Sequence, residues 1–232
     1  MLSPIFNAFQ QADLFGKFIF LSLFICSLVT WVIILKKIKV QKKVHQNGLL
    51  FAAPFQKKRI NPISVALKES KTAFQRLFCA FQNEAFRFLK KNTYESEGMS
   101  HSYLSSSDLE LVEEQVAISI SKEIRGLEKN LFVLSTIVSL APFLGLLGTV
   151  WGILLTFFEL QAAGGHIQSS DAMLGGLAMA LATTVVGLIV AIPALLGYNY
   201  LKNNLNHISQ EMEDFGQTLL CGLKEYYREE SK

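Results

Sequence analysis

Residues Ser139 to Leu155 read S-L-A-P-F-L-G-L-L-G-T-V-W-G-I-L-L, an apolar run that contains one proline, three glycines and one threonine. This run lies in one of three blocks without charged residues, which cover 18, 28 and 30 residues at 18–35, 131–158 and 172–201. A helix needs about 20 apolar residues to cross the hydrocarbon core of a bilayer. The blocks therefore predict an all-α membrane protein with three transmembrane helices.

The first block has a rival interpretation, a cleavable signal peptide. A signal peptide carries its basic residues before the apolar core. Here no basic residue precedes Lys17, and a basic cluster at 36–43 follows the block. This order favours an uncleaved signal anchor.

The basic residues predict the orientation in the membrane. Of the 22 Lys and Arg residues, 17 lie between Lys36 and Lys129, four follow Leu201 and none lies at 159–171. Because basic loops stay on the cytoplasmic side, we expect the N-terminus on the outer side of the membrane and the C-terminus in the cytoplasm. The formal net charge of +3 is then a signal of topology and not of nucleic-acid binding.

The expected division of the chain follows from the blocks and this orientation. It is an outer interfacial segment at 1–13, transmembrane helices at 14–35, 131–158 and 172–201, a helical cytoplasmic region at 36–130, a periplasmic loop at 159–171 and a cytoplasmic helical tail at 202–232.

Apolar residues outside the blocks recur at helical spacing and predict long helical cytoplasmic extensions. A core-forming face is expected from Ala66, Phe74, Leu77, Phe78, Phe81, Ala85, Phe88 and Leu89. A heptad seam is expected from Leu201, Leu205, Ile208, Met212, Phe215 and Leu219. Before the first block, a short interfacial helix or a frayed terminus is expected around Ile5, Phe6, Phe9 and Ala12.

Ser107 and Glu110 have the spacing of a capping box, in which two side chains satisfy free backbone N–H groups at a helix start. We expect a helix to begin there, after a polar loop at 92–107. Apolar residues then recur at helical spacing up to Leu131, with no Pro or Gly pair to stop them. The pattern predicts one long helix that runs into the second transmembrane block.

Small residues form one face on each of the last two transmembrane helices. On the second helix the face consists of Gly145, Thr149, Gly152 and Thr156, and Gly148 forms a further small pair with Gly152. On the third helix it consists of Gly176, Ala180, Thr184, Gly187 and Ala191. Small side chains let helices approach closely in a membrane, so both faces are expected to pack on protein. Pro142 and Pro193 each remove a backbone hydrogen bond and permit a kink, which serves either packing or gating.

Thr149 and Thr184 are expected at similar depth, because the second and third helices run in opposite directions. Two hydroxyls then face one cavity, where groups that donate and accept hydrogen bonds order water or a permeating cation. The alternative is that each threonine bonds the backbone carbonyl four residues earlier in its own helix.

The three blocks contain no Asp, Glu, Lys, Arg or His, so if the protein conducts protons, the titrating carboxylate must come from another chain. An enzyme, a metal site and a cofactor are not expected, because the histidines lack metal-ligand spacing and no nucleophile motif is present. The histidines are His45, His101, His166 and His207. No disulfide framework is expected from the three cysteines, Cys26, Cys79 and Cys221.

Two segments carry a recognisable motif. They are A-P-F-L-G-L-L-G-T-V-W-G-I at 141–153 and G-L-A-M-A-L-A-T-T-V-V-G-L-I-V-A-I-P-A at 176–194, the latter followed by Tyr198 and Asn199. Together they resemble the TolQ/ExbB branch of the MotA/TolQ/ExbB proton channel family. Three crossings and a short first cytoplasmic segment are more similar to this branch than to the flagellar MotA form with four crossings.

The resemblance implies a stator in the bacterial inner membrane. Such a stator is a homo-oligomeric ring, a pentamer in this family, around the transmembrane helices of a TolR/ExbD-like single-span partner whose aspartate carries protons. The proton motive force then drives a TolA/TonB-like protein for envelope maintenance or outer-membrane transport. The pore threonines of the family correspond to Thr149 and Thr184, with Thr183 as a weaker candidate.

One position departs from the family pattern. Many relatives have a glutamate five residues before the threonine of the third helix, in G-x-x-E-A-L, whereas this chain has Met179 in G-L-A-M-A-L. This departure leaves a second hypothesis open, a non-conducting scaffold that assembles membrane partners. The sequence also leaves open a TolQ-like or an ExbB-like role, and protons or sodium as the ion.

Overall fold

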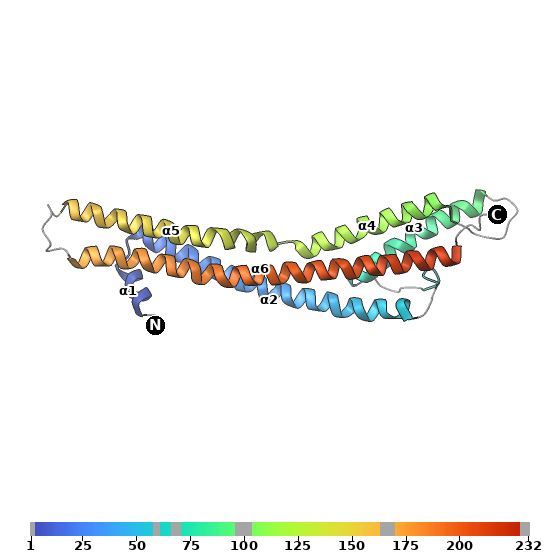
Figure 1. The fold of residues 1–232 in the computed structure, drawn as a ribbon, viewed down its shortest axis with the longest axis horizontal. Helices are drawn as coiled ribbons and strands as arrows, with labels where there is room; N and C mark the ends of the chain where they lie inside the picture. The colour runs from blue at the N-terminus through green and yellow to red at the C-terminus, as the bar shows by residue number, and fades with distance from the viewer. Residues whose placement is uncertain (1–2, 58–60, 66–70, 96–103, 163–169, 228–232) are drawn as a thin grey trace. The chain divides into compact units, whose positions relative to one another are not determined.

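The computed structural model describes residues 3–57, 61–65, 71–95, 104–162 and 170–227. These residues form six helices, α1 (Ser3–Gln11), α2 (Leu14–Lys57), α3 (Ala73–Glu95), α4 (Ser106–Glu128), α5 (Leu131–Ala162) and α6 (Ser170–Tyr227) (Figure 1). Three of them contain segments long and apolar enough to cross a membrane, at Leu14–Phe55, Leu131–Gln161 and Leu174–Tyr227. The predicted class, an all-α membrane protein with three transmembrane helices, is confirmed.

The chain divides into two compact units. The first unit consists of Met1–Lys37 and Asn130–Leu201, and the second of Ile38–Lys129 and Lys202–Lys232. α2 and α6 each contribute residues to both units, whereas α5 belongs to the first and α3 and α4 to the second. The three uncharged blocks all fall in the first unit.

The first unit exposes large apolar side chains. Phe143 is 67% exposed, Leu181 65% and Leu196 66%. Apolar surface of this extent is rare on proteins in water and suits the hydrocarbon of a bilayer. Smaller residues lie between its helices, and Ala141 and Ala194 are 0% exposed.

The second unit has a core of phenylalanine rings. α3 contributes Phe74, Phe78 and Phe81, each at most 1% exposed. Phe215 of α6 lies with its ring centroid 5.8 Å from that of Phe74, and Phe51 of α2 lies 5.6 Å from Phe78. Each such tilted or edge-on pair adds about 0.5–1.5 kcal/mol beyond the burial of its surface.

Both apolar patterns predicted for the second unit are confirmed among the described residues. The face on α3 is buried at Phe74, Leu77, Phe78, Phe81, Ala85, Phe88 and Leu89, whereas Ala66 lies outside the described residues. The seam on α6 is buried at Leu201, Leu205, Ile208, Met212, Phe215 and Leu219. The last four of these join the phenylalanine core.

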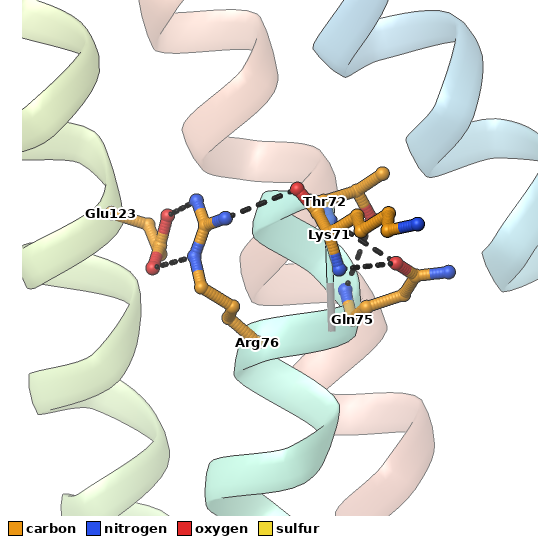
Figure 2. A network of polar contacts seen from close by, with 5 residues as sticks. All are labelled: Lys71, Thr72, Gln75, Arg76 and Glu123. Atoms are coloured by element: carbon orange, nitrogen blue, oxygen red, sulfur yellow. Dashed lines mark hydrogen bonds and ion pairs between the residues drawn. The ribbon is translucent and has the colours of Figure 1, made fainter. Parts of the chain in front are cut away.

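Side chains at the start of α3 cap the helix and tie it to α4 (Figure 2). The Gln75 side-chain oxygen accepts hydrogen bonds from the N–H groups of Lys71 and Thr72 at 3.0 and 3.1 Å, and the Thr72 hydroxyl accepts one from Gln75 N–H at 3.3 Å. Arg76 Nε donates to the Glu123 carboxylate on α4 at 2.7 Å, and its Nη2 donates to the second oxygen. This hydrogen bonding to Glu123 raises the pKa of Arg76, although burial opposes the shift.

The predicted single helix from 107 into the second transmembrane block is wrong, because the helix breaks at Asn130. α4 ends at Glu128 and α5 begins at Leu131. Asn130 has a φ of 73°, in the left-handed region. Asparagine tolerates this conformation better than most residues and ends helices in place of glycine. A search for Pro and Gly alone misses such a terminator.

The position predicted for the capping box at the start of α4 is also wrong, because the observed box lies two residues earlier in the chain. Ser105 is the N-cap, and the Asp108 carboxylate accepts a hydrogen bond from Ser105 N–H at 3.1 Å. The box therefore uses Ser105 and Asp108 in place of Ser107 and Glu110. Asp108 also accepts a hydrogen bond from Asn92 Nδ2 at 2.8 Å, a contact between α3 and α4 that local spacing does not contain.

Two remaining expectations concern chain ends and loops. α1 confirms a short helix at the N-terminus. The polar loop expected at 92–107 is described only in part, since α3 continues to Glu95 and residues 96–103 lie outside the described ranges.

Candidate functional site

α5 and α6 approach each other at backbone distance in the first unit. A Cβ atom at Gly152 would stand 2.8 Å from the carbonyl oxygen of Gly176, and one at Gly187 would stand 2.7 Å from that of Ala141. Both distances are shorter than van der Waals contact, so a side chain at either position would push the two backbones apart. Small residues allow such an approach between membrane helices.

The other small residues predicted for this face lie along the same seam. A Cβ atom at Gly145 would stand 3.0 Å from the Cα of Thr184, and Gly148 faces the Thr183 side chain. The Cβ of Ala180 lies against α5, 2.9 Å from where a side chain at position 152 would begin. We call this set of contacts the α5–α6 seam.

Three threonine hydroxyls gather at the consecutive carbonyl groups of Gly145 and Leu146. Thr149 donates to the Leu146 carbonyl at 2.7 Å, within α5. Thr184 donates across the seam to the Gly145 carbonyl at 3.1 Å. Thr183 donates to a carbonyl of its own helix at 2.8 Å and lies 3.5 Å from the Gly145 oxygen. The fold thus brings Thr149 and Thr184 to one turn of α5.

Burial separates these threonines. Thr183 is 0% exposed and enclosed against Gly148, whereas Thr149 and Thr184 are half-buried. The alternative expected from residue type, a bond to a backbone carbonyl of the threonine's own helix, applies to Thr149, whose acceptor lies three residues earlier instead of four. The spacing of four is found at Thr156, which donates to the Gly152 carbonyl at 2.8 Å. Thr184 differs because its hydroxyl joins two helices.

Pro142 and Pro193 lie inside α5 and α6, and both helices continue through them. Proline has no N–H group, so each leaves one carbonyl four residues earlier without its helical donor. The neighbour of Pro142, Ala141, has its carbonyl oxygen at the closest approach to Gly187. The missing hydrogen bond and the close backbone approach therefore fall in the same turn of α5.

A carboxylate that the sequence assigned to the outer segment also belongs to this region. Asp13 precedes α2, and its Oδ1 accepts a hydrogen bond from Gly16 N–H at 2.9 Å while its Oδ2 accepts one from Trp151 Nε1 at 3.0 Å. The rings of Phe15 and Trp151 lie 4.5 Å apart. The preference of Asp for helix N-caps was a signal for the Gly16 bond. The bond to Trp151 joins residues far apart in the chain and has no local signal.

Met179 lies in an apolar contact between α2 and α6. Its side chain is 2% exposed and packs in one cluster with Ala12 and Phe20. The Met179 thioether also lies close to the Cα of Gly16, where no side chain competes for the space. The position that carries a glutamate in the resembled pattern is therefore filled by hydrocarbon and sulfur in this chain.

Within the ranges that the structure describes, no three His, Cys, Asp or Glu side chains gather in a way that could hold a metal ion. His45 lies in the second unit with its Nδ1 2.8 Å from the Glu211 carboxylate. His101 and His166 lie outside the described residues.

Comparison with known proteins adds to this geometry. The sequence pattern of the MotA/TolQ/ExbB proton channel family matches residues 83–214, which include the whole α5–α6 seam. The Tol-Pal system protein TolQ of Haemophilus influenzae is 27% identical over 214 residues, 90% of this chain and 89% of that protein. The biopolymer transport protein ExbB of Aquifex aeolicus is 48% identical over 77 residues, 33% of this chain and 51% of that protein. An ExbB of Pseudomonas putida is 28% identical over 225 residues, 94% of this chain and 63% of that protein.

Proposed function

Because the chain belongs to the MotA/TolQ/ExbB proton channel family, we propose that it is the ring-forming stator subunit of a TolQ/ExbB-like complex. It is a multi-pass inner-membrane protein similar to TolQ and ExbB proteins. In the proposed complex a pentameric ring surrounds the transmembrane helices of a TolR/ExbD-like partner, and a carboxylate of that partner carries protons. The proton motive force then energises a TolA/TonB-like protein for envelope maintenance or outer-membrane transport.

The observation that carries this proposal is the meeting of Thr149 and Thr184 at one turn of α5. Their hydroxyls come from two helices, both are half-buried, and the surrounding blocks hold no charged residue. In an apolar environment such hydroxyls are the groups that can order water or a cation. We assign these two residues to the pore face and place Thr183 behind them in the seam, with Pro142 and Pro193 as the sites of helix kinks.

The proposed orientation rests on the basic residues. With 17 of 22 Lys and Arg residues at 36–129, this region and the tail at 202–232 are cytoplasmic, and the N-terminus and the loop at 159–171 are periplasmic. The membrane then covers 14–35, 131–158 and 172–201, and α1 lies in the outer interface at 1–13.

A double substitution tests the pore assignment. Thr149→Val with Thr184→Val keeps the side-chain shape and removes both hydroxyls, so we expect proton flux into vesicles to fall while the ring and its partner remain assembled. Thr136→Val is the matched control, because Thr136 is also on α5 and bonds a carbonyl of its own helix, at 2.9 Å to Phe132 O, as Thr149 does at Leu146 O, but it takes no part in the turn where Thr149 and Thr184 meet. Normal flux through an intact ring of the double variant would remove Thr149 and Thr184 from the pore.

The ring itself is tested by native mass spectrometry of the chain co-expressed with a single-span, carboxylate-bearing partner. We expect the mass of five copies that retain partner helices, as implied by the family. A monomer or dimer that binds no partner, under conditions that preserve other membrane assemblies, would contradict the stator.

Met179 favours one second candidate, a non-conducting scaffold. Its burial in an apolar cluster leaves no titratable group at that position. A scaffold predicts partner binding that ignores the proton gradient. Crosslinking between this chain and its partner that changes on addition of a protonophore would exclude the scaffold.

A further inference from the structure

The first unit carries a long apolar groove that the proposed function does not use. Its volume is about 920 Å³, and residues of α1, α2 and α6 line it. The lining includes Phe6 of α1, Phe18 and Phe24 of α2 and Ile189 of α6. Phe6, Phe18 and Phe24 are 59%, 63% and 61% exposed, so the rings border open space.

The groove has the length of one lipid leaflet. From Lys17 its lining on α2 extends to Ser27. At a rise of about 1.5 Å per residue this segment is about 15 Å long. The hydrocarbon core of a bilayer is about 30 Å thick, so one leaflet contributes about half of that length. An acyl chain parallel to α2 therefore fits the groove between Lys17 and Ser27.

A single charge marks one end of the groove. Lys17 lies in the first turn of α2 and is the one charged residue in the lining. The carboxylate nearest in sequence, Asp13, is engaged by Gly16 N–H and Trp151 Nε1. Among the residues that the structure describes, no carboxylate forms an ion pair with Lys17. The ammonium group is therefore available to an external anion.

The lining favours a flexible occupant over a second helix. Helices pack closely in membranes through small residues, as α5 and α6 do at Gly152. The groove is lined by five phenylalanines and by neither glycine nor alanine, and Ser27 is the one small residue in its lining. A helix of a second copy would also cover Lys17 with apolar side chains and leave its charge without a partner.

We propose that this groove binds an anionic phospholipid of the phosphatidylglycerol class. One acyl chain lies between α1, α2 and α6, and the phosphate lies at Lys17. The lipid belongs to the leaflet in which α1 lies. The lysine stem follows the apolar wall while its ammonium group reaches the level of the headgroup.

Native mass spectrometry of the full chain in detergent tests this site without any measurement of transport. With phosphatidylglycerol and phosphatidylcholine at equal concentration, we expect about fivefold greater retention of phosphatidylglycerol, the preference that one lysine near an anionic headgroup provides. Lys17→Gln removes the preference. Lys36→Gln is the matched control, because it removes one lysine of the first unit outside the lining and keeps the preference.

A second pair of variants tests the groove itself. Ile189→Trp fills the groove and is expected to reduce retention of both lipids, and it should fold because Ile189 is 58% exposed. Leu196→Trp, on α6 outside the lining, leaves retention unchanged. Equal retention of the two lipids, or a preference that survives Lys17→Gln, would overturn the proposal. So would disulfide crosslinking of a Phe18→Cys variant to a second copy in a background without the native cysteines, because it would place protein in the groove.

Discussion

α6 packs by two different chemistries in the two units to which it contributes. In the first unit it meets α5 through Gly176, Ala180 and Gly187. In the second unit it contributes Met212 and Phe215 to a core of aromatic rings. Hydrocarbon gives helices no hydrophobic reason to associate, so association depends on close approach and interhelical hydrogen bonds. In water the hydrophobic effect favours the association of apolar surfaces, so large apolar side chains can form the core of the second unit.

The same residue type has opposite places in the two units. Phe78 of the second unit is 0% exposed, whereas Phe143 of the first is 67% exposed. Large buried side chains therefore stabilise the second unit, whereas small residues between the helices stabilise the first. Four pairs of substitutions can break or sharpen this comparison.

The largest expected effect is that of Phe78→Ala. Removal of a fully buried ring from the core is expected to destabilise the second unit by about 3–5 kcal/mol. Faster amide hydrogen exchange in α3 and in the second-unit part of α6 would show it. Phe143→Ala, the matched control, is expected to change stability by less than about 0.5 kcal/mol. Equal effects of the two variants would contradict the conclusion that large side chains stabilise the second unit and not the first.

Gly152→Leu is expected to follow. Its side chain would meet the Gly176 carbonyl and Ala180 across the seam, and overpacking of this kind destabilises by about 1–3 kcal/mol. Gly126→Leu is the control, since Gly126 of α4 has nothing within 4 Å of a Cβ atom and gains up to about 1 kcal/mol in helix propensity. In thermal unfolding in detergent, Gly152→Leu should have a lower midpoint temperature than the unsubstituted protein, and Gly126→Leu should not.

A third pair compares two buried hydroxyls of the first unit. Thr183 donates a hydrogen bond at 2.8 Å, so Thr183→Val is expected to destabilise by about 1 kcal/mol. Thr30 is 1% exposed, and its hydroxyl has no hydrogen-bond partner among the described residues. Thr30→Val should therefore leave the unfolding midpoint unchanged or raise it. A loss of stability equal to that of Thr183→Val would reveal a partner for Thr30.

The smallest effect is expected at the ion pair of Figure 2. Arg76 and Glu123 are 47% and 16% exposed, so solvent screens the pair and Arg76→Ala is expected to cost about 0.2–1 kcal/mol, less in high salt. Arg76→Lys keeps the charge and loses the two-pronged geometry. A double-mutant cycle with Glu123→Gln measures the pair. A coupling that does not fall with salt would argue against an exposed pair.

Local patterns in the sequence predicted most of the fold. The three membrane-spanning segments follow from hydropathy, and the face of α3 and the seam of α6 follow from helical spacing. The break between α4 and α5 does not, because it depends on the backbone conformation of Asn130 and not on a residue that forbids helix.

The candidate site was predictable in part for a similar reason. The spacing of small residues indicated that α5 and α6 pack together. The depth of Thr149 and Thr184 in the second and third transmembrane helices indicated that these two residues lie close together. The bond from Thr184 to Gly145 and that from Trp151 to Asp13 join separate segments. Contacts of this kind depend on how helices are rotated against each other, which periodicity alone does not determine.

The hydrogen bonds of Thr149 and Thr184 also determine the sign of the charge that their turn presents. Each hydroxyl has one hydrogen, and both hydrogens point to backbone carbonyls. Each oxygen keeps its two lone pairs as acceptors. The turn is thus electronegative toward its surroundings, so it attracts the hydrogens of water or a cation and repels an anion. This polarity depends on the close approach at Gly145, because a Cβ atom there would stand 3.0 Å from the Cα of Thr184 and would push its hydroxyl away from the carbonyl acceptor.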